Sequence, residues 1–266
     1  MQTVSQGHKV RPAAVAGAFY PGAPDRLRAD VEDFLAAVPD YAGPNPKALI
    51  APHAGYLYSG RVAAAAFACL RHPASAIERV VVIGPAHYVA VRGIAVPKVD
   101  AFATPLGRVP VDRATLAALG DLPFVVADNG PHAPEHALEV ELPFLQAVLG
   151  PFSLVPLLVG DAEAFEVAEV LDRLWDGALI VVSSDLSHYL DYAAARRRDG
   201  RTAAAIERQA WGSLGPNDAC GFLPVAGLLR QTKARGLNVQ RLALCNSGDT
   251  AGPRDRVVGY GAWAFG

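Results

Sequence analysis

Four short apolar runs stand out along the chain, and each ends in turn-forming or polar residues. They cover residues 48–51, 80–83, 180–182 and 242–244. A short apolar run bounded in this way is typical of a buried strand. Pro52 directly follows the first run, and because proline cannot donate to a sheet ladder, it stops that strand. The pattern predicts four core strands that lead into polar segments.

Between and around these runs, apolar residues recur at helical spacing. Helices are expected over residues 23–38, 61–70, 113–119, 136–149, 163–174, 193–209 and 218–235, further strands over residues 124–126, 154–159 and 257–265, and a hairpin or lid over residues 102–111. Strands that alternate with helices imply an α/β fold with a mostly parallel central sheet and helices on both faces. No internal repeat or linker divides the sequence, so a single domain is expected over residues 1–266.

The amino-acid composition limits which kinds of molecule the protein is expected to bind. The chain is 52% hydrophobic and 19% charged, which provides a sizeable core and argues against wholesale disorder. The formal net charge is −2 and no basic block is present, so neither nucleic acid nor an anionic membrane is expected as the main partner. The sequence has no apolar run of transmembrane length, no apolar segment in its first ten residues, and only three cysteines. A cytoplasmic location is expected.

Two histidines follow predicted strands. His53 comes just after the strand at residues 48–51, and His87 follows the strand at residues 80–83. In open α/β sheets, ligands bind at the carboxyl ends of the strands. The pair is therefore a candidate for two imidazole metal ligands, although each could instead be a loop histidine that satisfies a backbone group. Imidazole suits Zn and Fe alike, so the pair does not choose a metal.

Asp185 and His188 follow the strand at residues 180–182, three positions apart. A histidine beside a carboxylate can be held in one tautomer and act as a general acid or base. The alternative is that Asp185 caps the following turn and His188 lies on the surface. A hydrolase triad built on Ser183 or Ser184 is weakly supported, because no Gly-x-Ser-x-Gly elbow surrounds them.

Two further candidate ligands follow the strand at residues 242–244. Asp249 could complete a site of two histidines and one carboxylate, the arrangement of many non-haem Fe(II) oxygenases; alternatively it is a turn residue after Gly248. Cys245 is either a soft ligand or a buried structural thiol.

Several other polar residues are candidates for the lining of the pocket. His136 and Glu139 lie three positions apart near the start of a predicted helix, where they could support the metal ligands or relay a proton. Tyr56 and Tyr58 could line a ligand cleft. Cys220 is expected to be structural or solvated.

Six motifs together resemble one family. They are Arg-Pro-Ala-Ala-Val-Ala-Gly-Ala-Phe-Tyr-Pro (11–21), Ala-Pro-His-Ala-Gly-Tyr (51–56), Gly-Pro-Ala-His-Tyr (84–88), Glu-His-Ala-Leu-Glu-Val-Glu-Leu-Pro-Phe-Leu (135–145), Ser-Ser-Asp-Leu-Ser-His-Tyr (183–189) and Cys-Asn-Ser-Gly-Asp-Thr-Ala-Gly (245–252). The chain resembles the Memo family, and in particular the bacterial proteins labelled AmmeMemoRadiSam system protein B. The fold of that family is similar to that of class III extradiol dioxygenases.

The resemblance implies a metal-binding pocket whose histidines fall on His53 and His87, with the acid/base histidine of the extradiol enzymes on His188 and Asp185 near it. In animal Memo the third ligand in the pocket is a cysteine, which aligns near Asp249, four residues from Cys245. With Asp249 as the third ligand, the chain would have the carboxylate of the dioxygenase triad and would depart from the animal pattern. That difference favours iron.

Three functions remain open from the sequence. The first is a non-haem Fe(II)-dependent oxygenase that acts on a small aromatic substrate, with Fe(II) as the expected metal and Zn or Cu as alternatives. The second is a non-catalytic module that binds a peptide or a protein next to a vestigial metal pocket. The third is a Zn-dependent hydrolase. The family name also implies a functional association with a radical-SAM protein and an AMMECR1-like protein.

Overall fold

The computed structural model describes residues 9–71 and 77–266. The strands are β1 (Val10–Arg11), β2 (Ala48–Ala51), β3 (Arg79–Pro85), β4 (Ile94–Val96), β5 (Ala101–Thr104), β6 (Gly107–Pro110), β7 (Val125–Ala127), β8 (Ser153–Val159), β9 (Leu179–Ser183), β10 (His188–Leu190), β11 (Val239–Asn246) and β12 (Val257–Phe265). The helices are α1 (Pro24–Ala36), α2 (Tyr56–Phe67), α3 (Arg113–Ala117), α4 (Leu142–Leu149), α5 (Ala164–Arg173), α6 (Tyr192–Glu207) and α7 (Phe222–Ala234), with short 3-10 turns that include η2 (Glu139–Glu141) and η4 (Ser247–Asp249).

Within the described residues, the main sheet has nine strands, in the order β10-β12-β2-β9-β3-β8-β4-β7, with β11 paired to β12. Its centre, β2-β9-β3-β8, is parallel, as expected for strands joined through helices. On one side β12 runs antiparallel to β2, β10 and β11, and on the other side β4 runs antiparallel to β8. The α/β fold is thus confirmed, but the sheet is mixed, with antiparallel strands on both sides of its parallel centre.

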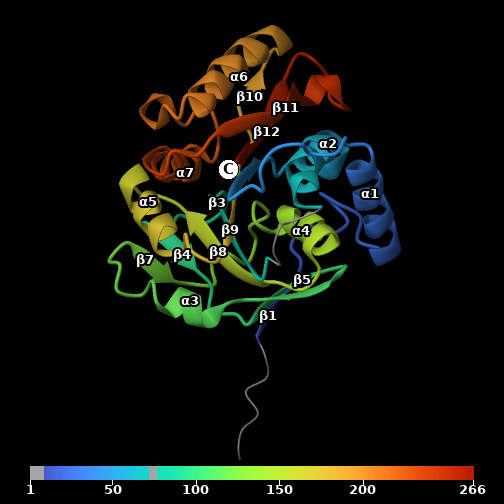
Figure 1. Cartoon of the computed structure of the whole chain (residues 1–266). Coiled ribbons are helices and arrows are strands. Elements are labelled where there is room, and N and C mark those ends of the chain that lie inside the picture. The colour runs from blue at the N-terminus through green and yellow to red at the C-terminus, as the bar shows by residue number, and fades with distance from the viewer. Residues whose placement is uncertain (1–8, 72–76) are drawn as a thin grey trace, which may run out of the picture.

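Helices cover both faces of this sheet (Figure 1). Helices α1, α2 and α4 pack against one another on one side, α5 and α7 pack together on the other, and α6 lies over β11 and β12. A separate sheet of β1, β5 and β6 forms at the predicted hairpin of residues 102–111. No helix within residues 9–71 and 77–266 is both long and apolar enough to cross a bilayer.

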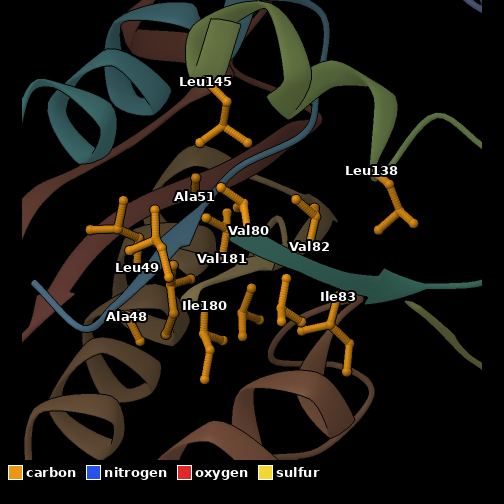
Figure 2. Packing of buried hydrophobic residues seen from close by; sticks show 14 of the residues in the cluster. Ala48, Leu49, Ala51, Val80, Val82, Ile83, Leu138, Leu145, Ile180 and Val181 are labelled. Atoms are coloured by element: carbon orange, nitrogen blue, oxygen red, sulfur yellow. The ribbon is translucent and has the colours of Figure 1, made fainter. Parts of the chain in front are cut away.

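The core lies between the central strands and the helices. Side chains from the predicted apolar runs, such as Leu49, Val82 and Ile180, are fully buried there (Figure 2). Burying a side chain of this size stabilises the fold by about 1.5–3 kcal/mol. This hydrophobic core fixes the positions of the strands whose carboxyl ends form the site.

Prolines move two helix starts away from the predicted positions. The helix expected from residue 136 begins as α4 at Leu142, with Pro143 in its first turn, and the helix expected from residue 218 begins as α7 at Phe222, with Pro224 in its first turn. Proline lacks the N–H that an interior helical position needs, and it is tolerated in a first turn. The segment before α4 therefore does not join the α-helix, and His136 lies in it, ahead of the short turn η2.

Candidate metal centre

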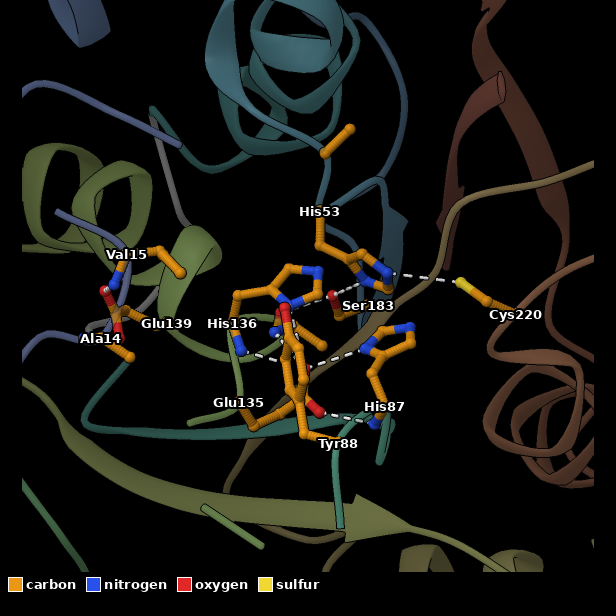
Figure 3. Close-up of polar contacts among 12 residues, drawn as sticks. Ala14, Val15, His53, His87, Tyr88, Glu135, His136, Glu139, Ser183 and Cys220 are labelled. Atoms are coloured by element: carbon orange, nitrogen blue, oxygen red, sulfur yellow. Dashed lines mark hydrogen bonds and ion pairs between the residues drawn. The ribbon is translucent and has the colours of Figure 1, made fainter. Parts of the chain in front are cut away.

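Three histidines meet at the carboxyl edge of the parallel strands. One ring nitrogen from each of His53, His87 and His136 lies within 4.8 Å of the others. The ring centroid of His53 is 5.1 Å from that of His87 and 5.3 Å from that of His136, and the His87 and His136 rings stack at 4.8 Å (Figure 3). Nitrogens on one metal ion, each about 2.0–2.1 Å from it, would lie up to about 4 Å apart. The group could hold a metal ion after small shifts of the side chains.

The sheet order explains why these residues meet. Strand β9 lies between β2 and β3, with Ser183 opposite Ala51 and Val182 opposite Ile83. His53 follows β2 and His87 follows β3, so the two histidines flank the end of β9. The third histidine, His136, reaches the same edge from the segment before η2 and α4.

Two of the rings are oriented by partners at Nδ1. The Nδ1 of His87 lies 2.9 Å from Glu135 Oε1, a carboxylate that can only accept. The Nδ1 of His53 lies 2.8 Å from Ser183 Oγ. A proton on Nδ1 leaves the Nε2 lone pair free for a metal ion, and a carboxylate behind a ligating histidine is a common arrangement in metal sites. The partners of the rings therefore fit a metal centre.

Burial lowers the pKa of two of the three histidines. Desolvation, followed by the nearby His87, lowers the pKa of His53 to about 3, and desolvation, followed by His53, lowers the pKa of His136 to about 4. Burial by itself would raise the pKa of Glu135, but hydrogen bonds from the side chain and backbone of His87 outweigh it and bring the pKa to about 2. At neutral pH His53 and His136 are thus neutral and lie beside the Glu135 carboxylate, and neutral imidazole is the form that a divalent metal needs.

The three histidines line a cavity of about 750 Å³. Asp185 and His188, the predicted acid/base pair, line the same cavity. The Nδ1 of His188 lies 2.8 Å from the carbonyl oxygen of Leu186, which can only accept, so Nδ1 has the proton and Nε2 is free to accept one. Aromatic side chains make up much of the remaining wall; they are Phe19, Tyr58, Tyr88, Tyr189 and Tyr260.

Asp249 is not among the three residues of the candidate metal group. Its carboxylate accepts hydrogen bonds from the Tyr192 hydroxyl at 2.5 Å and from the Asn246 backbone N–H at 3.1 Å. These contacts cap the turn η4, and Asp249 is exposed. The local turn satisfies this side chain, and the structure places His136 in the candidate metal group instead.

Cys245 also lies outside the candidate group. It is half-buried on β11, opposite Tyr260 on β12, and burial raises the pKa of its thiol to about 11. The cysteine that reaches the cavity is Cys220, just before α7, whose Sγ lies 3.3 Å from His53 Nε2. Its place in a turn between two helices gave no signal in the sequence.

Two other predicted residues of the pocket have structural roles. The Tyr56 hydroxyl donates to the Val140 carbonyl at 2.8 Å in the core, and Tyr58 lines the cavity instead. Glu139 is fully buried and accepts from the Arg11 guanidinium, the Tyr20 hydroxyl and two backbone N–H groups of the N-terminal loop. Figure 3 shows Glu139 apart from the histidines, beside that loop. Its contacts hold the loop that brings Phe19 onto His136, with ring centroids 4.6 Å apart.

Sequence reasoning missed Glu135 and the role of Ser183. Glu135 was available as the residue directly before His136, and Ser183 as the last residue of a predicted strand. Each supports a histidine that is distant in sequence, so only the folded chain shows the pairing.

Comparison with other proteins places the chain in a family. The family model described as Memo-like protein matches residues 11–264. A MEMO1 family protein from Aquifex aeolicus is 35% identical over 266 residues, covering 95% of this chain and 97% of the relative. A MEMO1 family protein from Thermotoga maritima is 36% identical over 279 residues, covering 94% of this chain and 97% of the relative.

A solved structure shares the fold. The crystal structure of an uncharacterized protein from Escherichia coli K12 is similar with a TM-score of 0.55 at 15% sequence identity, covering 82% of this chain and 98% of that one. At this identity the likeness concerns the fold alone. The predicted motifs, the family match and the close relatives agree, and the chain belongs to the Memo family.

Proposed function

We propose that this protein is a metal-dependent oxygenase that acts on a small aromatic substrate, with the metal held by His53, His87 and His136. The observation that carries the proposal is the meeting of three imidazoles in an aromatic-walled cavity of about 750 Å³. A cavity of this volume suits a ligand of small-molecule size.

We propose Fe(II) as the metal, with Zn or Cu as alternatives. Imidazole binds all three metals, so the donor set by itself does not distinguish them. The resemblance to class III extradiol dioxygenases favours iron, which would supply the redox chemistry for O₂ that no side chain of the protein can provide.

The chain's own residues would orient the substrate and move its proton. His188 lines the cavity, and because its Nδ1 is hydrogen-bonded to the Leu186 carbonyl, its Nε2 would accept a proton from a phenolic hydroxyl. Asp185 is buried, and its carboxylate accepts from the backbone N–H of His53 at 2.9 Å; it also interacts electrostatically with His188. The positive charge that forms on His188 would be stabilised by Asp185. Aromatic side chains such as Phe19 and Tyr88 would stack on the substrate ring and exclude water.

A Zn-dependent hydrolase is the second candidate, and one observation favours it. Three histidines are the protein ligands of some catalytic zinc sites, in which the metal lowers the pKa of a bound water molecule. The candidate group of this protein, His53, His87 and His136, consists of three histidines and so matches that ligand set.

The test is reconstitution of the metal-free protein under anaerobic conditions with Fe(II), Zn(II) or Cu, in parallel samples. Oxygen uptake is then recorded with a panel of phenols and catechols, and ester hydrolysis is recorded with the same samples. Oxygen uptake that needs both Fe(II) and a phenol supports the oxygenase. Hydrolysis with Zn(II) and no oxygen uptake would identify the hydrolase, and neither activity in any sample would support a binding module.

A further inference from the structure

We propose that Glu141 is a neutral, protonated acid that acts with Ser183 to fix the proton of His53 on Nδ1. Glu141 lies at the end of η2 and Ser183 at the end of β9, and neither side chain is exposed. Glu141 is therefore a positioning residue behind the candidate metal ligand. The assignment deepens the proposed function, since it explains why the His53 lone pair is available to a metal.

The argument counts protons around one hydroxyl group. Ser183 Oγ lies 2.7 Å from the Ala137 carbonyl oxygen, 2.8 Å from Glu141 Oε1 and 2.8 Å from His53 Nδ1. A hydroxyl has one hydrogen to donate and two lone pairs that accept. The Ala137 carbonyl can only accept, so the hydrogen of Ser183 belongs there. The other two contacts are hydrogen bonds only if Glu141 and His53 both donate.

Only one arrangement satisfies all three contacts at once. The Glu141 carboxyl O–H and the His53 Nδ1–H each donate to one lone pair of Ser183, and Ser183 donates to Ala137. An ionised Glu141 would compete with Ala137 for the single hydrogen and leave two oxygens in close contact with no proton between them. The geometry therefore points to the acid form of Glu141 and to the Nδ1–H tautomer of His53.

The surroundings of Glu141 support the neutral form. Its other oxygen, Oε2, is buried and has no hydrogen-bond partner among the described residues. Burial of the side chain raises the pKa of Glu141 well above its usual value, and the nearby Asp185 adds to that rise. A buried carboxylate with one hydrogen bond would be costly, whereas a neutral acid is not.

The first experiment uses the metal-free protein, so it does not depend on the proposed function. Nitrogen-15 NMR of histidine-labelled protein reports the tautomer of His53, with His53→Gln to assign its signals. Infrared spectra of the parent protein and of Glu141→Gln are compared for the carbonyl band of a protonated carboxyl group. We expect an Nδ1–H tautomer for His53 and loss of one such band in Glu141→Gln. An Nε2–H tautomer, or no band lost, overturns the assignment.

The second experiment measures Zn(II) and Fe(II) affinity at neutral pH. Ser183→Ala removes the acceptor of the Nδ1 proton, so its affinity should fall by about 10–100-fold, the usual effect of losing a partner behind a ligand. Glu141→Gln is also neutral and can donate through its amide, so it should bind metal as the parent protein does. A large loss of affinity in Glu141→Gln would indicate that the parent has a charged carboxylate there, against the assignment. If the parent protein itself binds neither Zn(II) nor Fe(II), the proposed function is contradicted. The NMR and infrared results on Glu141 and His53 would not be affected by that outcome.

Discussion

Nε2 of His53 lies 3.3 Å from Sγ of Cys220. With the proton of His53 on Nδ1, this nitrogen accepts, so the Cys220 thiol donates to the lone pair that a metal ion would use. Burial raises the pKa of that thiol to about 12, so it remains protonated at neutral pH. A metal ion that enters the site must displace this contact.

The first prediction concerns this competition. Cys220→Ala removes the S–H donor, and metal affinity should rise by roughly 2–10-fold, the equivalent of one hydrogen bond worth about 0.5–1.5 kcal/mol. Titration calorimetry with Zn(II) measures the change, and Cys245→Ala is the matched control because Cys245 lies outside the candidate group. A fall in affinity in Cys220→Ala would instead identify the thiol as a metal ligand.

The second prediction distinguishes His136 from Asp249 as the third ligand. Loss of a residue that hydrogen-bonds to a metal ligand lowers metal affinity by about 10–100-fold. His136→Ala removes a donor atom itself, so it should lower Fe(II) affinity by more than that. Asp249→Ala should leave the affinity unchanged, because that carboxylate caps η4. Anaerobic Fe(II) titrations of both variants decide between the two residues. The reverse result would restore Asp249 to the site.

The third prediction concerns His188 as an acid/base group. His188→Ala should retain the metal and slow turnover by about 10²–10⁴-fold, the usual cost of losing a general acid or base. The measurement pairs metal content with oxygen uptake on the best substrate found. Metal loss in this variant would make His188 a ligand, and unchanged turnover would remove it from the mechanism.

The fourth prediction concerns the buried pair of Arg11 and Glu139. Glu139→Gln leaves the Arg11 guanidinium buried without its counter-charge, so the free energy of unfolding should fall by about 3–5 kcal/mol. Asp30→Asn breaks a pair between a partly exposed carboxylate and the exposed Arg26, and it should cost no more than about 0.5 kcal/mol. Urea unfolding of both variants tests the difference. Equal losses would show that the Arg11 pair contributes little.

The fifth prediction is a pH dependence of stability at Asp199, which is distant from the candidate ligands in sequence. Burial raises the pKa of Asp199 to about 6, above its unfolded value of 3.8. The folded state therefore binds this proton more tightly than the unfolded state, and stability falls as pH rises from about 4 to about 6. Each pH unit in that window corresponds to about 1.4 kcal/mol.

Asp199→Asn mimics the protonated form and should lack this loss. The unfolding free energy of the variant relative to the parent should therefore increase between pH 4.5 and pH 6.5, as measured by urea unfolding at each pH. A constant difference across that range would show that Asp199 has an ordinary pKa in the folded protein.

The fold was largely predictable, because it depends on local patterns. The apolar runs at residues 48–51 and 80–83 became β2 and β3, and the histidines after them lie together. The antiparallel flanks were not predictable, since strand direction depends on which strands pair across the sheet.

The third histidine was harder to place. The apolar spacing extends the predicted helix back to His136, but Pro143 delays its start and leaves His136 in a loop that reaches the site. Asp249 was a plausible ligand by residue type, yet Asn246 and Tyr192 satisfy its carboxylate locally. The pattern of residues along a chain shows which side chains follow the end of a strand. It does not show in which direction the turn after that strand orients them.

The position of β12 beside β2 has a consequence for synthesis of the protein. The strand that leads to His53 is β2. On one side its residues 48–50 pair with residues 263–265 of β12, and on the other side it pairs with β9. During translation, the first candidate ligand thus leaves the ribosome long before the strand that supports it. Contacts of such long sequence separation form late and slow folding. A nascent chain would have its histidines exposed but not assembled, so we expect that any metal ion binds only after β12 has paired with β2.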